Sequence, residues 1–214
     1  MTTLNGLRIV LADDHTIVRM GFRLLIEGAG GTVVEEANSG ETALSAYAEH
    51  TPEVLVMDVS MPGMGGLAAL ERLLARHRGA RVLMLSAHED TQIPARALQA
   101  GATGYLSKRA HPNELLKAIA AVSRGEHFID SELAPRLAMA CMGGNSNPAS
   151  SLTAREFNVF VQLAHGRSVA DVAATLKLSN STVGTHLYHI KQKLNADNAA
   201  ELALIAVRAG LVEA

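Results

Sequence analysis

The sequence has only one cysteine and no long run of apolar residues. With Cys141 as its only thiol, the chain cannot form an internal disulfide or a metal site built from several thiolates. This cysteine usage is typical of a reducing compartment, so we expect a cytoplasmic protein. No apolar stretch approaches the length of a membrane span, and Met1–Leu4 lacks the basic and apolar pattern of a secretory signal. We therefore expect no membrane partner.

The sequence also lacks a strong excess of either charge, and its formal net charge at pH 7 is -2. Residues 1–149 carry 13 Lys and Arg against 16 Asp and Glu, whereas residues 150–214 carry 6 against 5. This asymmetry is too weak to identify a nucleic-acid-binding region, so any case for DNA binding has to come from residue pattern. Hydrophobic residues make up 48% of the chain, which is enough for a sizeable buried core.

Short apolar runs alternate with longer segments of helical spacing in the first part of the chain, which predicts a parallel sheet covered by helices on both faces. Small and turn-forming residues at 143–151 predict a flexible linker. We therefore divide the chain into residues 1–125, a connecting region 126–151 with a short helical segment, and residues 152–214. The predicted strands are Arg8–Ala12, Val33–Ala37, Val54–Met57, Val82–Leu85 and Gly104–Leu106, and the predicted helices are Ile17–Glu27, Glu41–Glu49, Gly66–His77, Thr91–Ala100 and Glu114–Arg124.

The last part of the chain has a purely helical pattern, and each of its four helices has a recognisable start. The second and third helices are joined by the brief turn Lys177–Ser179, which predicts a helix-turn-helix and hence DNA binding. Two capping-box pairs, Thr153 with Glu156 and Ser168 with Asp171, begin the first two helices, Ser179 can cap the third, Asn180–Leu194, and the fourth follows Asp197.

Acidic and polar residues stand where the predicted strands end. Asp13 and Asp14 close the first strand, Asp58 the third and Ser86 the fourth, and Lys108 follows the fifth. With a strand order of 2-1-3-4-5, these side chains converge at one edge of the sheet. Three carboxylates in one pocket require a cation, and hard oxygen ligands suit Mg²⁺. An aspartate beside Mg²⁺ can attack a phosphoryl donor and form an aspartyl phosphate, with Lys108 and Ser86 stabilising the transferring group.

Four stretches in this region together resemble the receiver domain of two-component response regulators, over about residues 6–125. They are Val10–His15, Met57–Gly63, Leu85–Ala87 and Gly104–Lys108. The resemblance implies a flavodoxin-like (βα)5 fold with Asp58 as phosphoacceptor and a sensor histidine kinase as phosphoryl source. It implies that Asp14 and Asp58 bind Mg²⁺ directly, that Asp13 acts largely through water, and that the Ser60 carbonyl is a further ligand. Ser86 and Tyr105 are implied to be the pair that switches conformation on phosphorylation.

Residues 152–212 resemble the four-helix output domain of the NarL/LuxR (FixJ-like) regulators. The matching stretches are Leu152–Glu156, Val172–Ala173, Leu178–His186 and Lys191–Leu194. The resemblance implies double-stranded DNA, RNA polymerase and a second copy of the chain as partners. It implies that the fourth helix serves dimerisation, although its apolar stripe would equally suit packing on its own domain. The resemblance implies that Gly184, Thr185 and Tyr188 are the base-reading positions. From the residues themselves we predict phosphate contacts at Thr182, His186, Lys191 and Lys193, with Lys193 alternatively on a solvated face.

The sequence thus predicts a phosphorylated transcription regulator with an α/β receiver and an all-α DNA-binding domain. One alternative is a regulator that binds DNA independently of phosphorylation. A second is an Asp-dependent phosphatase, but such an enzyme needs a general acid shortly after the nucleophile, where this chain has Ser60. We therefore expect no enzyme activity of that kind.

Overall fold

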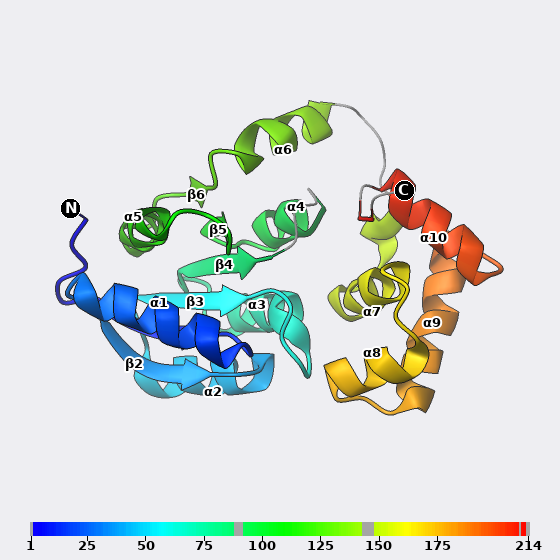
Figure 1. Cartoon of the computed structure of the whole chain (residues 1–214), viewed down its shortest axis with the longest axis horizontal. Coiled ribbons are helices and arrows are strands. Elements are labelled where there is room, and N and C mark those ends of the chain that lie inside the picture. Colours follow the sequence, from blue (N-terminus) through cyan, green and yellow to red (C-terminus); the bar gives the residue numbers. More distant parts are fainter. Residues whose placement is uncertain (1, 88–91, 143–147, 210, 213–214) are drawn as a thin grey trace.

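The computed structural model describes residues 2–87, 92–142, 148–209 and 211–212. A parallel α/β part is followed by α6 (Leu133–Met142), and a helical part forms the rest of the molecule (Figure 1). Position 91, where one helix was predicted to begin, and positions 143–147 of the predicted linker lie outside the described residues. None of the described helices has both the length and the apolarity that crossing a bilayer requires.

The sheet has the strand order β2-β1-β3-β4-β5-β6, and every neighbouring pair is parallel. The predicted order 2-1-3-4-5 is therefore confirmed, with a sixth strand added at the edge. That strand has two residues, which is too short to produce a periodic signal in the sequence. The strands are β1 (Arg8–Ala12), β2 (Thr32–Ala37), β3 (Val54–Asp58), β4 (Val82–Ser86), β5 (Gly104–Ser107) and β6 (Phe128–Ile129).

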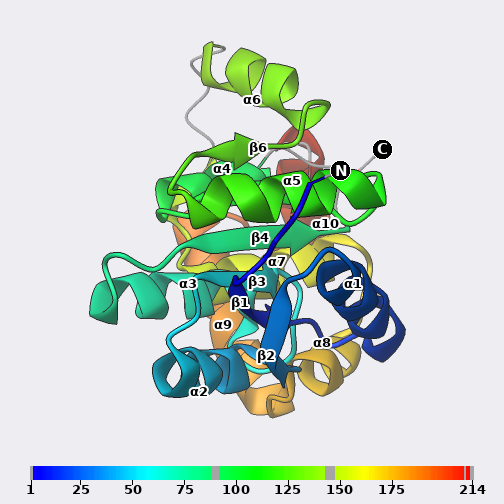
Figure 2. The ribbon, with the colours of Figure 1, turned by 90° about the vertical axis from the view of Figure 1, so that its left-hand side faces the viewer.

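Helices cover both faces of the sheet, as its continuously apolar central strands require. Ile9, Leu11 and Val56 point into a core with α1 and α5, whereas Val10 and Met57 point into the opposite core with α2, α3 and α4. Figure 2 shows α1 on one side of the sheet and α2 and α3 on the other. The helices are α1 (Thr16–Gly28), α2 (Gly40–His50), α3 (Gly65–Arg76), α4 (Gln92–Gln99) and α5 (Pro112–Ser123).

Among the residues described from position 148 onward there are four α-helices, and their predicted caps are confirmed. Thr153 and Glu156 form a capping box, as do Ser168 and Asp171, and the Ser179 side chain accepts a hydrogen bond from the Thr182 backbone. These caps satisfy backbone groups that have no partner within the first turn of each helix. A 3-10 turn (Pro148–Ser151) precedes α7 (Ala154–Ala164), α8 (Val169–Leu176), α9 (Asn180–Leu194) and α10 (Ala199–Arg208).

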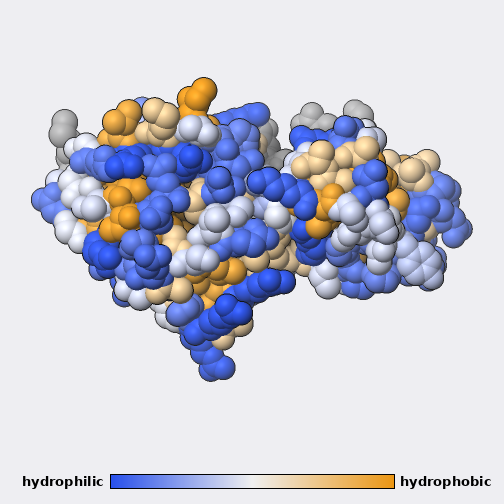
Figure 3. All heavy atoms as spheres, turned by 90° about the horizontal axis from the view of Figure 1, so that it is seen from below, coloured by the Kyte–Doolittle hydropathy of each residue, from blue (hydrophilic) through white to orange (hydrophobic). Residues whose placement is uncertain are grey.

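The carboxyl ends of the strands face the helical part, and in Figure 1 the arrows of β3 and β4 point toward α7 and α8. The Gly63 amide donates to the Leu176 carbonyl over 3.1 Å. Arg96 of α4 lies 4.3 Å from the Phe157 ring centre and donates to the Leu152 carbonyl. Gly63 belongs to the loop after β3 and Leu176 to α8, so this loop is in direct contact with the helix-turn-helix. Figure 3 shows the molecule as two lobes whose visible face is largely hydrophilic.

Candidate functional site

The acidic pocket lies at the carboxyl edge of the sheet, where β1 and β3 are neighbours. Asp13 follows β1 and Asp58 ends β3, and their exposed fractions are 0% and 1%. Ser86, at the end of β4, is equally buried. Burial of two carboxylates at one sheet edge is unfavourable unless cations or hydrogen bonds compensate for the lost hydration. The sheet therefore concentrates negative charge at this edge.

Lys108 supplies part of this compensation. Its Nζ lies 2.7 Å from Asp13 Oδ2 and 2.8 Å from Asp58 Oδ2. The backbone directs it there, since the Lys108 amide donates to the Ser86 carbonyl over 2.8 Å just beyond β5. One lysine thus bridges two buried carboxylates. The sequence predicted that these side chains converge, but not that Lys108 contacts both carboxylates.

Burial and charge change the pKa of both partners. Burial raises the pKa of Asp58, an effect that Lys108 opposes and Asp13 reinforces. Burial acts to lower the pKa of Lys108, but Asp58 and Asp13 outweigh it, and the pKa is raised. Lys108 is therefore held as an ammonium. Burial still disfavours the charged form of Asp58, and a further cation nearby would reduce this penalty.

The donor set fits a divalent metal ion. Asp13, Asp14 and Asp58, with His15, present ligand atoms within 4.8 Å of one another. Among the described residues, one lysine is paired with these three carboxylates, and it contacts two of them. The remaining negative charge and the oxygen donors are what Mg²⁺ prefers. Asp14, whose side chain is 31% exposed, lies on the open side of the pocket.

The backbone of the loop after β3 (residues 59–64) is held at several points. The Ser60 amide donates to Asp58 Oδ1 over 3.2 Å, and the Met64 amide donates to Glu41 Oε1 over 2.8 Å. The Gly66 amide donates to the Val59 carbonyl over 2.9 Å. This last contact brings α3 so close to β3 that no side chain fits at Gly66. Asp58 thus stands at the start of a loop that is bonded at both ends.

The two residues of the predicted switch pair both lie in the core. Ser86 is one residue beyond the Asp58–Leu85 pairing of β3 and β4, and Tyr105, on β5, pairs with Met84. The exposed fraction of Tyr105 is 1%, so its ring is buried in the core and does not lie on the surface. The structure thus places Ser86 at the carboxyl end of β4, next to β3, and Tyr105 in the core shared with α2, α3 and α4.

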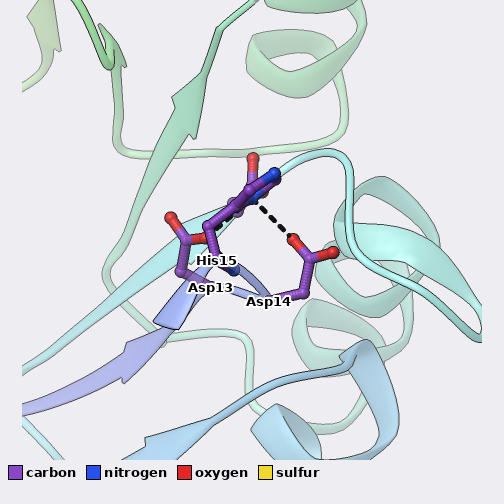
Figure 4. Close-up of side chains that lie close together, drawn as sticks. Asp13, Asp14 and His15 are labelled. Atoms are coloured by element: carbon purple, nitrogen blue, oxygen red, sulfur yellow. Dashed lines mark hydrogen bonds and ion pairs between the residues drawn. The ribbon is translucent and has the colours of Figure 1, made fainter. Parts of the chain in front are cut away.

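His15 is the pocket residue that we did not predict from the sequence. Its Nδ1 lies 3.0 Å from Asp14 Oδ1 and 3.3 Å from Asp13 Oδ1, and Figure 4 shows the ring between the two carboxylates. His15 is also the N-cap of α1, but its side chain makes no capping hydrogen bond. Its position directly after two aspartates was the available signal.

The third helix of the C-terminal part presents the predicted DNA-contacting face to solvent. Val183, Ile190 and Leu194 are buried, which turns the opposite side outward. Tyr188 has an exposed fraction of 61%, the largest on this face among the exposed apolar or aromatic side chains. Of the remaining predicted contacts, Thr182, Gly184, Thr185 and Lys193 are exposed, and His186 and Lys191 are half-buried.

Three of the predicted phosphate contacts have partners or surroundings within the protein. Lys193 Nζ lies 2.6 Å from Glu156 Oε2, and Lys191 Nζ donates to the Asp197 carbonyl over 2.8 Å. Burial lowers the pKa of His186, and Arg155 adds to this effect, which favours the neutral ring. The charges of Lys191 and Lys193 are thus partly used to join α9 to α7 and to the segment at Asp197, contacts that the sequence pattern did not indicate.

Comparisons with known proteins cover the whole of this architecture. Residues 9–120 match the response regulator receiver domain, and residues 150–206 match the bacterial regulatory proteins of the luxR family. The response regulator UvrY of Escherichia coli is 36% identical over 211 residues, 97% of each chain. GacA of Pseudomonas viridiflava is 38% identical over 97% of this chain and 99% of its own. A structure of RcsB from Salmonella enterica serovar Typhimurium, bound to a promoter with the phosphomimetic BeF3−, is 25% identical with a TM-score of 0.66, covering 94% of this chain and 98% of RcsB.

An α/β domain with an acidic pocket, joined to a helix-turn-helix, defines a signal-controlled transcription regulator. The chain belongs to the family of two-component response regulators that carry a LuxR-type DNA-binding domain. The predicted fold class and family are thereby confirmed, as is the prediction that the protein is a regulator and not an enzyme.

Proposed function

We propose that Asp58 accepts a phosphoryl group from a sensor histidine kinase and that this modification controls DNA binding. The observation that carries the proposal is the bridging of buried Asp58 and Asp13 by Lys108 at 2.8 and 2.7 Å. A carboxylate oxygen of Asp58 attacks phosphorus, and the bond to the donor histidine nitrogen breaks. Lys108 offsets the negative charge that remains on the transferred oxygens, and Ser86 donates a hydrogen bond to them.

We assign Mg²⁺ to the acidic pocket, with Asp14 and Asp58 as direct ligands, Asp13 acting through water, and the Ser60 carbonyl as a further ligand. When bound, the ion supplies positive charge to the oxygens of the transferring group. The support is the excess of carboxylates over lysine in the pocket. Lys108 holds the nucleophile in place, and the Ser60 amide orients Asp58 Oδ1. Ser86 and Tyr105 are proposed to respond to the phosphoryl group.

The helix-turn-helix is proposed to bind double-stranded DNA as a homodimer in the cytoplasm, with RNA polymerase as a further partner at promoters. Gly184, Thr185 and Tyr188 are proposed to face base edges, with Thr182, His186, Lys191 and Lys193 near phosphates. The exposed face of α9 and the promoter-bound form of RcsB support this assignment. Dimerisation is assigned to α10, where Leu204 is 52% exposed. Pairing two such domains adds contacts and fixes half-site spacing.

The loop after β3 is proposed to couple the two halves, which we place at residues 1–125 and 152–214, joined by 126–151. Ser60 contacts Asp58 through its amide, and three residues later Gly63 donates to the Leu176 carbonyl at the end of α8. Ser60 also lines a small cavity between the halves together with Phe157 and Asn158. A charge added to Asp58 therefore acts on a loop that directly contacts the DNA-binding domain.

The test is the intact mass of the full chain after incubation with acetyl phosphate. With Mg²⁺ present we expect the gain of one phosphoryl group, and with EDTA we expect none, because the carboxylates then repel the donor. Peptide mapping should locate the group on the segment containing Asp58. A folded protein that binds its DNA and gains no mass under these conditions would favour the alternative, a regulator that acts independently of phosphorylation.

Gly184 on α9 either permits close approach of the backbone to DNA or only removes a base contact, and Gly184→Ala is expected to separate these two roles. An added Cβ meets no atom within 4 Å, so alanine should increase the free energy of unfolding by about 0.8–1 kcal/mol. If the backbone approaches DNA closely at Gly184, the same variant should weaken operator binding. Urea denaturation and DNA titration measure these two effects.

Gly21→Ala is the matched control, because Gly21 also lies within a helix and its added Cβ would meet open space. It should gain similar stability without any change in DNA affinity. Loss of stability in Gly184→Ala would contradict the open geometry of this site.

A further inference from the structure

We propose that His15 is a nitrogen ligand of the acidic pocket and that it raises the affinity of the pocket for Zn²⁺ and similar transition-metal ions, but not for Mg²⁺. The proposal rests on the metal site assigned above and adds a donor to it. The imidazole lies on the open side of the pocket, over Asp13 and Asp14, in the arrangement that Figure 4 shows. Its side chain is 64% exposed, so the ring can adjust to a bound ion.

The distances match those between neighbouring ligands of one ion. Metal–nitrogen and metal–oxygen bonds of about 2.1 Å place adjacent ligand atoms about 3.0 Å apart in an octahedron and about 3.4 Å apart in a tetrahedron. His15 Nδ1 lies 3.0 Å from Asp14 Oδ1 and 3.3 Å from Asp13 Oδ1. The ligand atoms of these three residues and Asp58 all lie within 4.8 Å of one another. One ion can therefore be reached by the imidazole and the carboxylates with small movements.

The backbone fixes His15 in this place independently of its ring. The His15 amide donates to Asp13 Oδ1 over 2.8 Å, and the residue is the N-cap of α1. Since the ring takes no part in capping the helix, its contacts are with the two carboxylates. A ring on a fixed backbone at the rim of a carboxylate pocket is suited to complete a mixed nitrogen and oxygen ligand set.

The nature of the donors determines which ions benefit. Mg²⁺ prefers oxygen and keeps several of its waters, so an added imidazole contributes little to its binding. Zn²⁺, Co²⁺ and Ni²⁺ bind imidazole well, and a site with both nitrogen and oxygen donors favours them. His15 therefore acts on the selectivity of the pocket, not on the affinity for every divalent ion.

A purely ionic role for His15 predicts the opposite sign. If the ring only neutralised the carboxylates as an imidazolium, it would compete with any incoming cation. Removing the ring would then leave metal binding unchanged or strengthen it, for Mg²⁺ and Zn²⁺ alike. Coordination predicts a loss of binding that is confined to the ions that accept nitrogen.

The experiment is a set of competition titrations of the full chain, with Zn²⁺ against a chromophoric chelator and with Mg²⁺ by calorimetry. We expect His15→Ala to weaken Zn²⁺ binding by at least about tenfold. Losing a residue that only hydrogen-bonds to a metal ligand already weakens binding by about that factor, and His15 would be a ligand itself. Mg²⁺ binding should change by less than about twofold. His15→Asn keeps a polar group at the rim but lacks a ring nitrogen, so it should behave like His15→Ala.

Two controls establish that the pocket is the site measured. His127→Ala removes an exposed histidine outside the pocket and should leave the Zn²⁺ affinity at this site unchanged. Asp13→Asn combined with Asp58→Asn should weaken both metals. In nitrogen NMR spectra of the histidine rings, the resonance of His15 Nδ1 should shift on addition of Zn²⁺ and not of Mg²⁺.

Equal Zn²⁺ affinity in the wild type and His15→Ala would overturn the proposal, as would an equal loss for both metals or full rescue by His15→Asn. A wild type that fails to bind Mg²⁺ would contradict the magnesium site under the proposed function. In that case a Zn²⁺-dependent shift of His15 Nδ1 would still support its role as a ligand.

Discussion

Asp58→Asn should abolish phosphoryl transfer and, in the absence of metal, make the protein more stable. The amide has no anionic oxygen to attack phosphorus, so the expected loss of labelling is complete. The amide oxygen can still accept from the Ser60 amide, which now donates to Asp58 Oδ1 over 3.2 Å, and Lys108 keeps Asp13 as a partner at 2.7 Å. The fold is therefore expected to remain intact.

The gain in stability follows from the direction of the pKa shift. Burial raises the pKa of Asp58, which means that folding is opposed by the charge of this carboxylate at neutral pH. Substitution by the neutral amide removes this cost, and we expect a gain on the order of 1 kcal/mol. For an acid whose pKa is raised on folding, the cost is present at high pH and disappears in acid. The difference between the two proteins should therefore vanish as the pH falls to where the folded and unfolded carboxyls are both protonated.

The measurements are intact mass after acetyl phosphate treatment and urea denaturation in EDTA at several pH values. Asp130→Asn is the matched control, because Asp130 is also buried but accepts from the Glu132 amide over 2.9 Å and the Ser107 amide over 3.3 Å. This variant should still be phosphorylated and should lose stability. An Asp58→Asn protein that labels normally would refute the assigned phosphoacceptor.

The convergence of Asp13, Asp58 and Lys108 could be predicted because it depends on strand ends alone. Parallel strands end at one edge, so residues just after β1, β3 and β5 meet there once the strand order is given. The helix starts were equally accessible, since Thr153 and Ser179 act within their own first turns. The helix starts depend on local sequence, and the convergence of the pocket residues depends on the strand order of the parallel sheet, so both could be predicted.

Other contacts could not be predicted because they depend on side-chain direction or on distant segments. The direction of the His15 ring depends on where α1 begins, and Lys193 meets Glu156 only after α9 has packed against α7. The contact between Gly63 and the Leu176 carbonyl joins segments that are far apart in the chain. Such pairs produce no periodic pattern in the sequence. From the sequence alone, a lysine that forms an ion pair, such as Lys193, therefore cannot be told from one that is simply exposed.

Gly66→Ala is expected to distort the acidic pocket by displacing the backbone of Asp58. An alanine Cβ at this position would overlap the Asp58 carbonyl oxygen and would lie 2.9 Å from both the Asp58 carbonyl carbon and the Val59 Cα. These atoms belong to the backbone of β3 and its loop, which cannot rotate away as a flexible side chain would. We expect a loss of about 2–3 kcal/mol in the free energy of unfolding, the usual cost of overpacking a core.

The same displacement should reach the reacting atoms, because Asp58 itself carries the carbonyl that must move. A shift of about 1 Å in a nucleophile can cost on the order of a hundredfold in rate, so labelling by acetyl phosphate should slow by about that factor in protein that is still folded. Gly79→Ala is the control, since an added Cβ there meets no atom within 4 Å. It should change stability by less than about 0.5 kcal/mol and leave the labelling rate unchanged. If Gly66→Ala labelled at the wild-type rate, the packing of α3 against Asp58 would not determine the position of the phosphoacceptor.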